Sequence, residues 1–332
     1  MTPASKYAYG VPRQGFAFRS PSVTVTAHAN AGYRRLFGGD GLTFGVGFPL
    51  AASTDPERAP PPVDRELELA AHAEAVGFDG LWVRDVPLYW PRFGDAGQVF
   101  DTWPWLSHVA AHTDEIALGT ASVVLPLRHP VHVAKSAATI DRLSGGRLVL
   151  GVASGDRDPE YEAFGVDRDD RGELFRESVT WLRCLWREEF PELDGRWGRL
   201  DGALDLVPKP TTGTIPLLPT GRARQELSWL GKHGDGWLFY HLPEETLSSY
   251  LAQWRDVAGD KPYVMAVRTE LADDPTADPE PIHQGYRAGV EWFRSYFERV
   301  GSIGVDHVIV SPGGSDPETA VSAFAEHVVE KL

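Results

Sequence analysis

The sequence predicts an α/β protein: a (β/α)8 TIM barrel that follows an irregular N-terminal extension. The first observation is a strict alternation of eight short apolar runs with eight amphipathic segments. The second is that these runs are almost continuously apolar, as in parallel strands buried on both faces. The third is that no Gly-x-Gly-x-x-Gly sequence follows the first run. Together they favour a barrel over a doubly wound sheet, which commonly has about five or six strands.

The barrel is expected to occupy residues 42–332 as one domain, behind an extension at residues 1–41. The extension contains Gly, Pro, Ser and scattered aromatic residues without a sustained period. From residue 42 onward, the apolar runs predict strands at 42–50, 80–86, 116–127, 146–155, 215–221, 236–240, 261–271 and 307–312.

The segments between these runs carry helix signals. Asp64 is a candidate N-cap for the first helix, and Pro130 suits the first turn of the third. Apolar residues recur at helical spacing in the fourth, where Phe175, Val179 and Leu182 share one face. Helices are therefore expected at 64–76, 102–113, 130–143, 172–189, 224–232, 243–258, 286–300 and 321–332.

Composition narrows the class of protein. The net charge of -15 argues against a nucleic-acid-binding surface, which needs a basic stripe. The N-terminus has no apolar signal-peptide core, and no apolar run reaches the ~18 residues of a membrane helix. The single cysteine, Cys184, lies in a helical pattern and suits a reducing compartment. We expect a soluble, cytoplasmic protein without a nucleic-acid or membrane partner.

Metal and nucleophile motifs are not evident. His108 and His112 are four residues apart on a predicted helix, but no Glu stands beside them as in zinc proteases. The sequence contains no Gly-x-Ser-x-Gly elbow, and the paired carboxylates of a barrel glycosidase are not obvious. We therefore expect no metal site.

The residues that follow the strands are the candidates for chemistry, because barrel active sites lie at the carboxyl ends of the strands. The second strand ends in Arg84 and Asp85, and the third in Arg128 and His129. On so acidic a chain this edge is rich in arginine, whose planar fork of donors suits phosphate and carboxylate.

The segment "PTGRARQELSWL" (219–230) gives the sharpest signal. Gly221 permits a close approach of the backbone to a ligand, and the following helix start offers N–H groups to an anion. Arg222 and Arg224 add positive charge. A phosphate site is predicted here; the alternative is a simple strand-to-helix turn with two arginines in solvent.

Three further features have two interpretations each. Ser154, after the fourth strand, is either a ligand contact or part of a turn. His129 is more often structural than catalytic at such a position. Arg84 and Asp85 form either a structural ion pair at the barrel mouth or part of the chemistry. We expect Arg84 to face the pocket or to neutralise Asp85, and Asp85→Asn to impair activity more than folding.

A long aromatic loop follows the Arg-Asp pair in "LWVRDVPLYWPRFGDAGQVFDTW" (81–103). It is expected to roof the pocket, with Gly94 and Gly97 allowing it to bend. Its aromatic residues, Trp90, Phe93 and Phe100, are expected to provide apolar cover for a ligand.

Several motifs in order resemble the bacterial luciferase-like flavin monooxygenases. They are "LGTASVVLPLRHPVHVAKSAATIDRLSGGRLVLGVASGDRDPEYEAFGVDRDDRGELFRE" (118–177), "LVPKP" (206–210) and "TGRARQELSWLGKHGDGW" (220–237). Each motif is weak alone, but their order and spacing make the resemblance specific. It covers roughly residues 30–332.

The resemblance implies a barrel, typically a homodimer, that binds FMN or in some branches a deazaflavin coenzyme. It places the flavin phosphate near the ends of the fourth and fifth strands and the ring against the third. Arg84 or Arg128 is then a candidate to support the anionic reduced ring. Asp85 and His129 are the other catalytic candidates, and Tyr161 is a candidate lid. The cofactor-binding candidates are Ser122, Arg128, Ser154, Tyr161, Gly221, Arg222, Ala223 and Arg224.

The chemistry implied by the resemblance is the activation of O2 by reduced FMN, and a separate flavin reductase supplies the reduced FMN. One oxygen atom is then transferred to a small organic substrate. The segment after the seventh strand (272–285) is shorter than the lid of some family members. Three alternatives therefore stay open. They are a deazaflavin-dependent dehydrogenase, a flavin-binding protein without turnover and, from the 11 tryptophans, a carbohydrate-active barrel that lacks the carboxylate pair.

Overall fold

Eight parallel strands form the centre of the protein. The computed structural model describes residues 29–49, 62–93, 100–314 and 316–332. The barrel strands are β1 (Thr43–Phe48), β2 (Gly80–Val83), β3 (Ala117–Val124), β4 (Leu148–Ala153), β7 (Leu217–Pro219), β8 (Trp237–Tyr240), β9 (Tyr263–Leu271) and β12 (His307–Gly313). Each coincides with a predicted strand, so the predicted number and order of the barrel strands are confirmed.

The pairing of these strands closes a barrel. The continuous part runs β9-β12-β1-β2-β3-β4-β7, and β8 pairs with β9 on its other side. A parallel bridge between Thr220 and Leu238 joins the β7 and β8 edges. The predicted (β/α)8 architecture is therefore correct.

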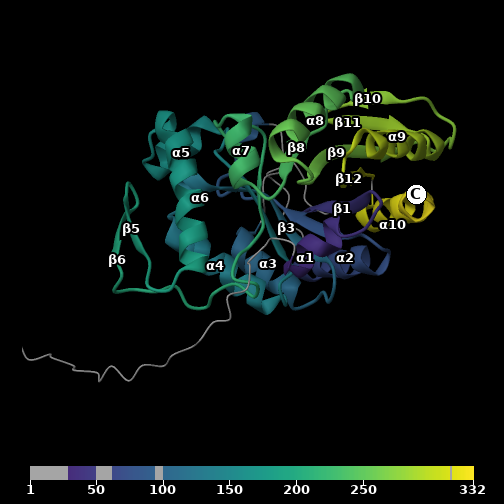
Figure 1. Ribbon diagram of the computed structural model, residues 1–332. Coiled ribbons are helices and arrows are strands. Elements are labelled where there is room, and N and C mark those ends of the chain that lie inside the picture. Colours follow the sequence, from purple (N-terminus) through teal and green to yellow (C-terminus); the bar gives the residue numbers. More distant parts are fainter. Residues whose placement is uncertain (1–28, 50–61, 94–99, 315) are drawn as a thin grey trace, which may run out of the picture.

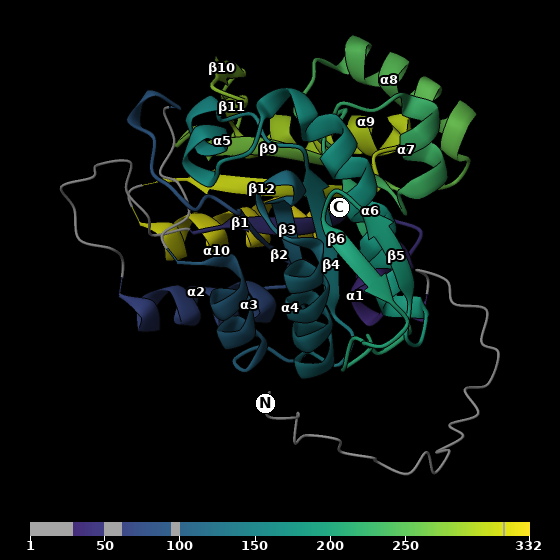
Figure 2. The same cartoon turned by 90° about the vertical axis from the view of Figure 1, so that its left-hand side faces the viewer.

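The helices surround the barrel strands, with α2, α3 and α4 along one side (Figures 1 and 2). Pro130 occupies the first helical position of α4, as predicted. The helices of the alternation are α2 (Val63–Ala75), α3 (Thr102–Ala110), α4 (Pro130–Leu143), α6 (Arg171–Arg187), α7 (Leu227–His233), α8 (Glu244–Ala258), α9 (Val290–Ile303) and α10 (Pro317–His327).

The structure adds elements that the periodicity did not predict. They are α1 (Ala31–Phe37), α5 (Asp158–Phe164), the hairpin β5 (Glu192–Gly195) and β6 (Gly198–Asp201), and the hairpin β10 (Glu280–Ile282) and β11 (Gly285–Ala288). The hairpin β5–β6 projects from the barrel beside α4 and α6 (Figure 1). The remaining 3-10 turns are η2 (Pro91–Phe93), η3 (Leu125–Leu127), η4 (Arg168–Asp170) and η5 (Val329–Lys331).

Helix α1 corrects the expectation that residues up to 41 are irregular. The Asn30 side chain accepts a hydrogen bond from the backbone N–H of Tyr33 at 2.8 Å, which caps the helix. Asn30 also donates to Asp141 and to the carbonyl oxygen of Leu148, both at 3.2 Å, so it ties the helix to the barrel. Helix α1 has only seven residues, too few to show a sustained apolar period, and its local sequence signal is the Asn30 cap.

The barrel lumen holds an apolar cluster separate from the shell between strands and helices. Nearly every barrel strand contributes one residue to it, and Tyr33 and Leu36 of α1 close its amino end. The strand residues are Trp82, Ala117, Val149, Leu218, Leu238, Val264 and Ile309. Because side chains alternate along a strand, these positions identify which residues nearer the carboxyl end also face the lumen.

A histidine lies at the base of the lumen. Nε2 of His307 accepts a hydrogen bond from the indole N–H of Trp82 at 3.0 Å. The Thr43 hydroxyl, which donates to Leu36 O at 2.7 Å, lies 2.7 Å from Nδ1 and accepts its proton. This network assigns a neutral ring with the proton on Nδ1. Complete burial lowers the pKa of His307 to about 3.

Candidate active site

Side-chain alternation places a polar layer at the carboxyl end of the lumen. Two residues beyond Trp82 is Arg84, and two beyond Leu238 is Tyr240, which is 45% exposed. Arg268 and Ser311 follow Val264 and Ile309 on the same faces, and both are exposed. This alternation directs Arg84 toward the lumen, which agrees with the direction predicted from the sequence.

Asp85 faces the opposite way and pairs with Arg128, not with Arg84. Its side chain is 2% exposed. Its carboxylate oxygens accept hydrogen bonds from Nη2 and Nε of Arg128 at 2.6 and 2.8 Å. Thr102 Oγ1 and the backbone N–H of Val124 each donate to the same carboxylate at 3.2 Å. The group therefore links the exits of β2 and β3 to the start of α3.

Arg128 is committed to this pair. Burial acts to lower the pKa of its guanidinium, but the hydrogen bonds and charge of Asp85 outweigh that effect and raise the pKa. Asp101 lies 3.5 Å from its Nη2. Arg128, predicted as a cofactor contact, thus lies on the outer side of the β2–β3 exit with its fork engaged.

His129 is the N-cap residue of α4. Its Nδ1 accepts a hydrogen bond from Val131 N at 3.3 Å. Its Nε2 donates to the carbonyl oxygen of Trp197, in the β5–β6 turn, at 2.8 Å. Its ring also makes edge contacts with the rings of His132, Trp181 and Trp197. Both ring nitrogens therefore hold the hairpin and the helix, and the catalytic role predicted for His129 stays a prediction.

Ser122 on β3, a predicted cofactor residue, meets Thr220, which directly follows β7 and was not singled out by the sequence. The hydroxyls of Ser122 and Thr220 share a hydrogen bond that reaches across β4. Strand β4 has Gly151 below this bond, where a Cβ atom would lie 2.0 Å from Thr120 O and 3.3 Å from Ser122 Oγ. The glycine is required for this close approach.

Ser154 and Tyr161 lie next to this group. Ser154 is 7% exposed, and its carbonyl oxygen accepts a hydrogen bond from the Tyr161 hydroxyl. Tyr161 belongs to α5 and is only 2% exposed. Burial raises the pKa of its hydroxyl to about 12. Tyr161 thus supports the loop from below, which differs from the lid that the resemblance implies.

The turn after β7 has an unusual backbone. Gly221, Ala223 and Arg224 have φ of 58, 44 and 59°, in the left-handed region. That conformation costs a residue with a Cβ atom about 1–2 kcal/mol, and such strained positions concentrate at ligand sites. A Cβ atom built on Gly221 would meet nothing within 4 Å, so the turn opens to one side. Left-handed residues in a turn form concavities of N–H groups that bind anions.

Three side chains that the sequence did not single out brace this turn. Nε2 of Gln225 donates to Gly172 O at 2.7 Å and to Ala223 O at 3.2 Å. Its Oε1 accepts from Nη2 and Nε of Arg176 at 2.8 and 3.1 Å. The indole N–H of Trp237 donates to Gly221 O at 2.6 Å. Only the tertiary contacts reveal these roles.

Arg222 and Arg224 are both exposed on this turn. The guanidinium of Arg222 stacks over the rings of Trp237 and Tyr250, at 5.6 and 5.8 Å from their centroids. Arg222 is thus held against β8 and α8, and the phosphate contact predicted for the two arginines stays a prediction. A concave backbone, a serine and two arginines form a donor set that fits a phosphate.

The roof loop is only partly described. Gly94 and Gly97 lie outside the described residues, so their predicted role is not addressed. Trp90 is half-buried, and Phe93 ends the 3-10 turn η2. Phe100 packs its ring 5.3 Å from that of Trp105 on α3, on the outer face of the barrel wall.

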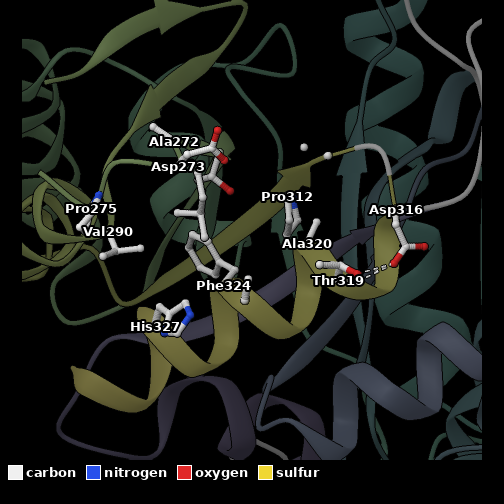
Figure 3. A pocket seen from close by; sticks show the side chains of 15 residues that line it. Ala272, Asp273, Pro275, Val290, Pro312, Asp316, Thr319, Ala320, Phe324 and His327 are labelled. Atoms are coloured by element: carbon white, nitrogen blue, oxygen red, sulfur yellow. Dashed lines mark hydrogen bonds between the residues drawn. The ribbon is translucent and has the colours of Figure 1, made fainter. Parts of the chain in front are cut away.

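A cavity of about 640 Å³ lies outside the barrel lumen, between the ends of strands β9 and β12 and helix α10. Figure 3 shows Ala320 and Phe324 of α10 facing Ala272 and Val290 across it. Thr269 lines it from β9 and points away from the lumen, since it follows Arg268. This cavity is therefore separate from the residues described above.

The described ranges contain neither a candidate metal site nor a membrane-spanning helix. Within them, no cluster of three or more His, Cys, Asp or Glu side chains is arranged to hold a metal ion. Within the same ranges, no helix combines the length and apolar character needed to cross a membrane.

Comparison with known proteins identifies the family. The sequence model of the luciferase-like monooxygenases matches residues 42–298. The chain belongs to the luciferase-like monooxygenase family. The resemblance found in the sequence is thereby confirmed.

Relatives within the luciferase-like family differ in cofactor and reaction. An F420-dependent glucose-6-phosphate dehydrogenase of Mycobacterium avium is 33% identical over 180 residues, which are 52% of this chain and 52% of that protein. A 4-hydroxyprotoasukamycin monooxygenase of Streptomyces nodosus subsp. asukaensis is 29% identical over 58% of this chain and 52% of that protein. The chain spans about half the length of the relatives that it matches.

Solved structures of this luciferase-like fold agree with the barrel. An F420-dependent secondary alcohol dehydrogenase, in complex with an F420-acetone adduct, aligns with a TM-score of 0.71. The alignment covers 87% of this chain and 98% of that one, at 21% sequence identity. This likeness establishes the fold.

Proposed function

We propose that this chain is a flavin-dependent oxidoreductase that acts on a small organic substrate. The observation that carries the proposal is the left-handed, braced turn from Gly221 to Arg224. It lies beside Ser154 at the carboxyl end of the barrel, and its donor set suits the phosphate that FMN and the deazaflavin coenzyme both carry.

The chain's own residues hold and orient the cofactor in this proposal. The backbone of the 221–224 turn and the Ser154 hydroxyl bind its phosphate, with Arg222 and Arg224 adding charge. The Ser122–Thr220 pair forms the polar part of the wall beside the ring. When bound, a reduced cofactor supplies the electrons for the reaction, and the protein contributes positioning and electrostatic support.

An FMN-dependent monooxygenase is the first candidate reaction, on the sequence resemblance over residues 30–332. A deazaflavin-dependent dehydrogenase is the second, and it is supported by relatives such as the dehydrogenase of M. avium. A homodimer, a separate flavin reductase and O2 as co-substrate belong to the first candidate and stay predictions.

Cofactor titration tests the proposal. FMN and coenzyme F420 are titrated separately against the wild type, Arg222→Ala/Arg224→Ala and Arg199→Ala, an exposed arginine on β6 that serves as a control. We expect one cofactor to bind and the double variant to bind it about tenfold more weakly, because two charges at the phosphate are lost. Binding of neither cofactor to the wild type would refute the proposal.

Oxygen consumption then separates the reactions. With reduced FMN bound, substrate-dependent O2 uptake identifies the monooxygenase. Substrate-dependent reduction of F420 without O2 uptake identifies the dehydrogenase. A protein that binds a cofactor and supports neither reaction across a panel of alcohols, aldehydes and ketones is the flavin-binding alternative.

A further inference from the structure

Three neighbouring strands place a small polar group opposite the proposed phosphate site. Arg268 on β9 and Ser311 on β12 are register partners. On the next strand, a Cβ atom built on Gly47 of β1 would lie 3.1 Å from the Ser311 hydroxyl. Arg268, Ser311 and Gly47 therefore occupy neighbouring positions on the lumen face of three adjacent strands.

Among the described residues, no side chain pairs with the charge of Arg268. Its backbone N–H donates to Gln284 O at 2.9 Å, which fixes the strand, but its exposed side chain has no hydrogen bond or ion pair with the described residues. Glu270, the next residue on that face, pairs with Arg287 at 3.3 Å. This contrasts with Arg128, whose fork is filled by Asp85.

The surrounding charges at the mouth are mainly positive. Burial raises the pKa of the Tyr240 hydroxyl, and the carboxylate of Asp156 acts in the same direction. Arg84 and Arg157 both lie close enough to oppose this rise. Two arginines and one carboxylate thus act on Tyr240, so the balance of charge around it is positive on a chain whose net charge is -15.

The strand order separates this group from the turn after β7. Strands β9, β12 and β1 are consecutive, and β4 and β7 lie across the barrel from β12 and β1 in the closed order. A cofactor held by its phosphate at β4 and β7 leaves this side for the substrate. The side that remains carries a cation and a hydroxyl.

We propose that Arg268 and Ser311 bind an anionic group of the substrate, so that the substrate is a small organic carboxylate, sulfonate or phosphate ester. Arg268 supplies a charged fork of donors and Ser311 one further donor, while Gly47 leaves room for the anion. This inference rests on the proposed function for the location of the cofactor.

Calorimetric titration with benzoate tests the subsite, with neutral benzamide as the shape-matched comparison. The variants are Arg268→Gln, Arg268→Lys and Ser311→Ala, with Arg199→Gln as the control for an exposed arginine far from the mouth. We expect wild type to prefer benzoate to benzamide at constant ionic strength. Arg268→Gln should weaken benzoate binding at least tenfold, or about 1.4 kcal/mol. Arg268→Lys and Ser311→Ala should give intermediate losses, and Arg199→Gln none.

Parallel titration of FMN and F420 distinguishes the source of the anion. Unchanged cofactor affinity in Arg268→Gln supports a substrate subsite. An equal loss of cofactor and benzoate affinity assigns Arg268 to the cofactor and overturns the proposal, as does equal binding of benzoate and benzamide by the wild type. If no cofactor binds the wild type, the proposed function fails, while the benzoate series still decides whether the anion subsite exists. Circular dichroism melts verify that each variant is folded, and Arg268→Lys replaces Arg268→Gln if the latter is not.

Discussion

Replacing Asp85 by Asn is expected to cost stability, which reverses the expectation from the sequence. There, the position at the end of a barrel strand indicated chemistry. In the structure, the Asp85 carboxylate accepts four hydrogen bonds, two of them from Arg128 at 2.6 and 2.8 Å. An amide keeps the shape but loses the charge, and one end of it presents donors to a guanidinium that has only donors.

The size of the loss follows from the burial of the pair. Removing one partner of a fully buried ion pair costs about 3–5 kcal/mol, because the other charge is left unpaired. Asp85 is 2% exposed, but Arg128 is 23% exposed and can recover some hydration. We therefore expect a loss of about 2–4 kcal/mol. An unfolding entropy of about 2.1 cal/mol/K per residue converts this to a fall in Tm of roughly 3–6 °C for 332 residues.

Calorimetric melts of Asp85→Asn, Arg128→Gln and the double variant measure the effect and the coupling between the two residues. Glu244→Gln is the matched control, since Glu244 pairs with Arg299 at 3.0 Å on the surface, where the side chains are 35% and 42% exposed. That exposed pair should contribute less than about 1 kcal/mol. An unchanged Tm in Asp85→Asn, with turnover abolished, would refute the structural role and restore the catalytic one.

Two further outcomes are expected. The pKa of His307 is about 3 in the folded protein, and its ordinary value is 6.5. Between pH 6.5 and pH 3 the imidazole is therefore protonated in the unfolded chain but not in the folded one, so the free energy of unfolding falls as the pH falls. From pH 6.5 to 5 the wild type should lose about 2 kcal/mol more unfolding free energy than His307→Gln in urea titrations, and equal losses would contradict the assignment of a neutral ring. Gln225→Ala should weaken cofactor binding about tenfold by freeing the 221–224 turn, as measured by flavin fluorescence, while Gln253→Ala on the exposed face of α8 should not. An unaltered affinity in Gln225→Ala would mean that the turn holds its shape without the brace.

The alternation of side chains along the strands predicts which face of the barrel wall many site residues occupy. It does not predict which residues their charged groups contact. Alternation along β2 is sufficient to place Arg84 and Asp85 on opposite faces once Trp82 is known to face the lumen. It does not reveal that Asp85 meets Arg128, 43 residues away. Nor does it reveal that Gln225 bridges the turn to Gly172. Such contacts depend on how neighbouring strand–helix units pack against one another. The periodic pattern of apolar residues in one sequence does not predict them.

The expected helix at 286–300 shows how tertiary contacts override a periodic pattern. Its apolar stripe is real, since Phe293, Phe297 and Val300 are buried on α9. The helix begins only at Val290, because 285–288 form strand β11 beside β9. A Cβ atom at Gly285 would lie 1.8 Å from Arg268 O. The glycine thus serves a close strand contact, which a local pattern of apolar residues does not encode.

The distribution of charge connects the fold with the proposed chemistry. Asp85 neutralises Arg128 within the wall, and Glu270 neutralises Arg287 beside β11, so these pairs contribute little net field at the lumen. Arg268 lies on β9, the same strand as Glu270, without such a partner among the described residues. A charge that the fold does not use for its own stability is free to act on a ligand, and its long-range attraction is screened by salt over about 8–10 Å. The acidic chain is therefore expected to repel anions in general and to attract them at one end of its barrel, where the proposed cofactor phosphate and the proposed substrate anion would lie on opposite walls.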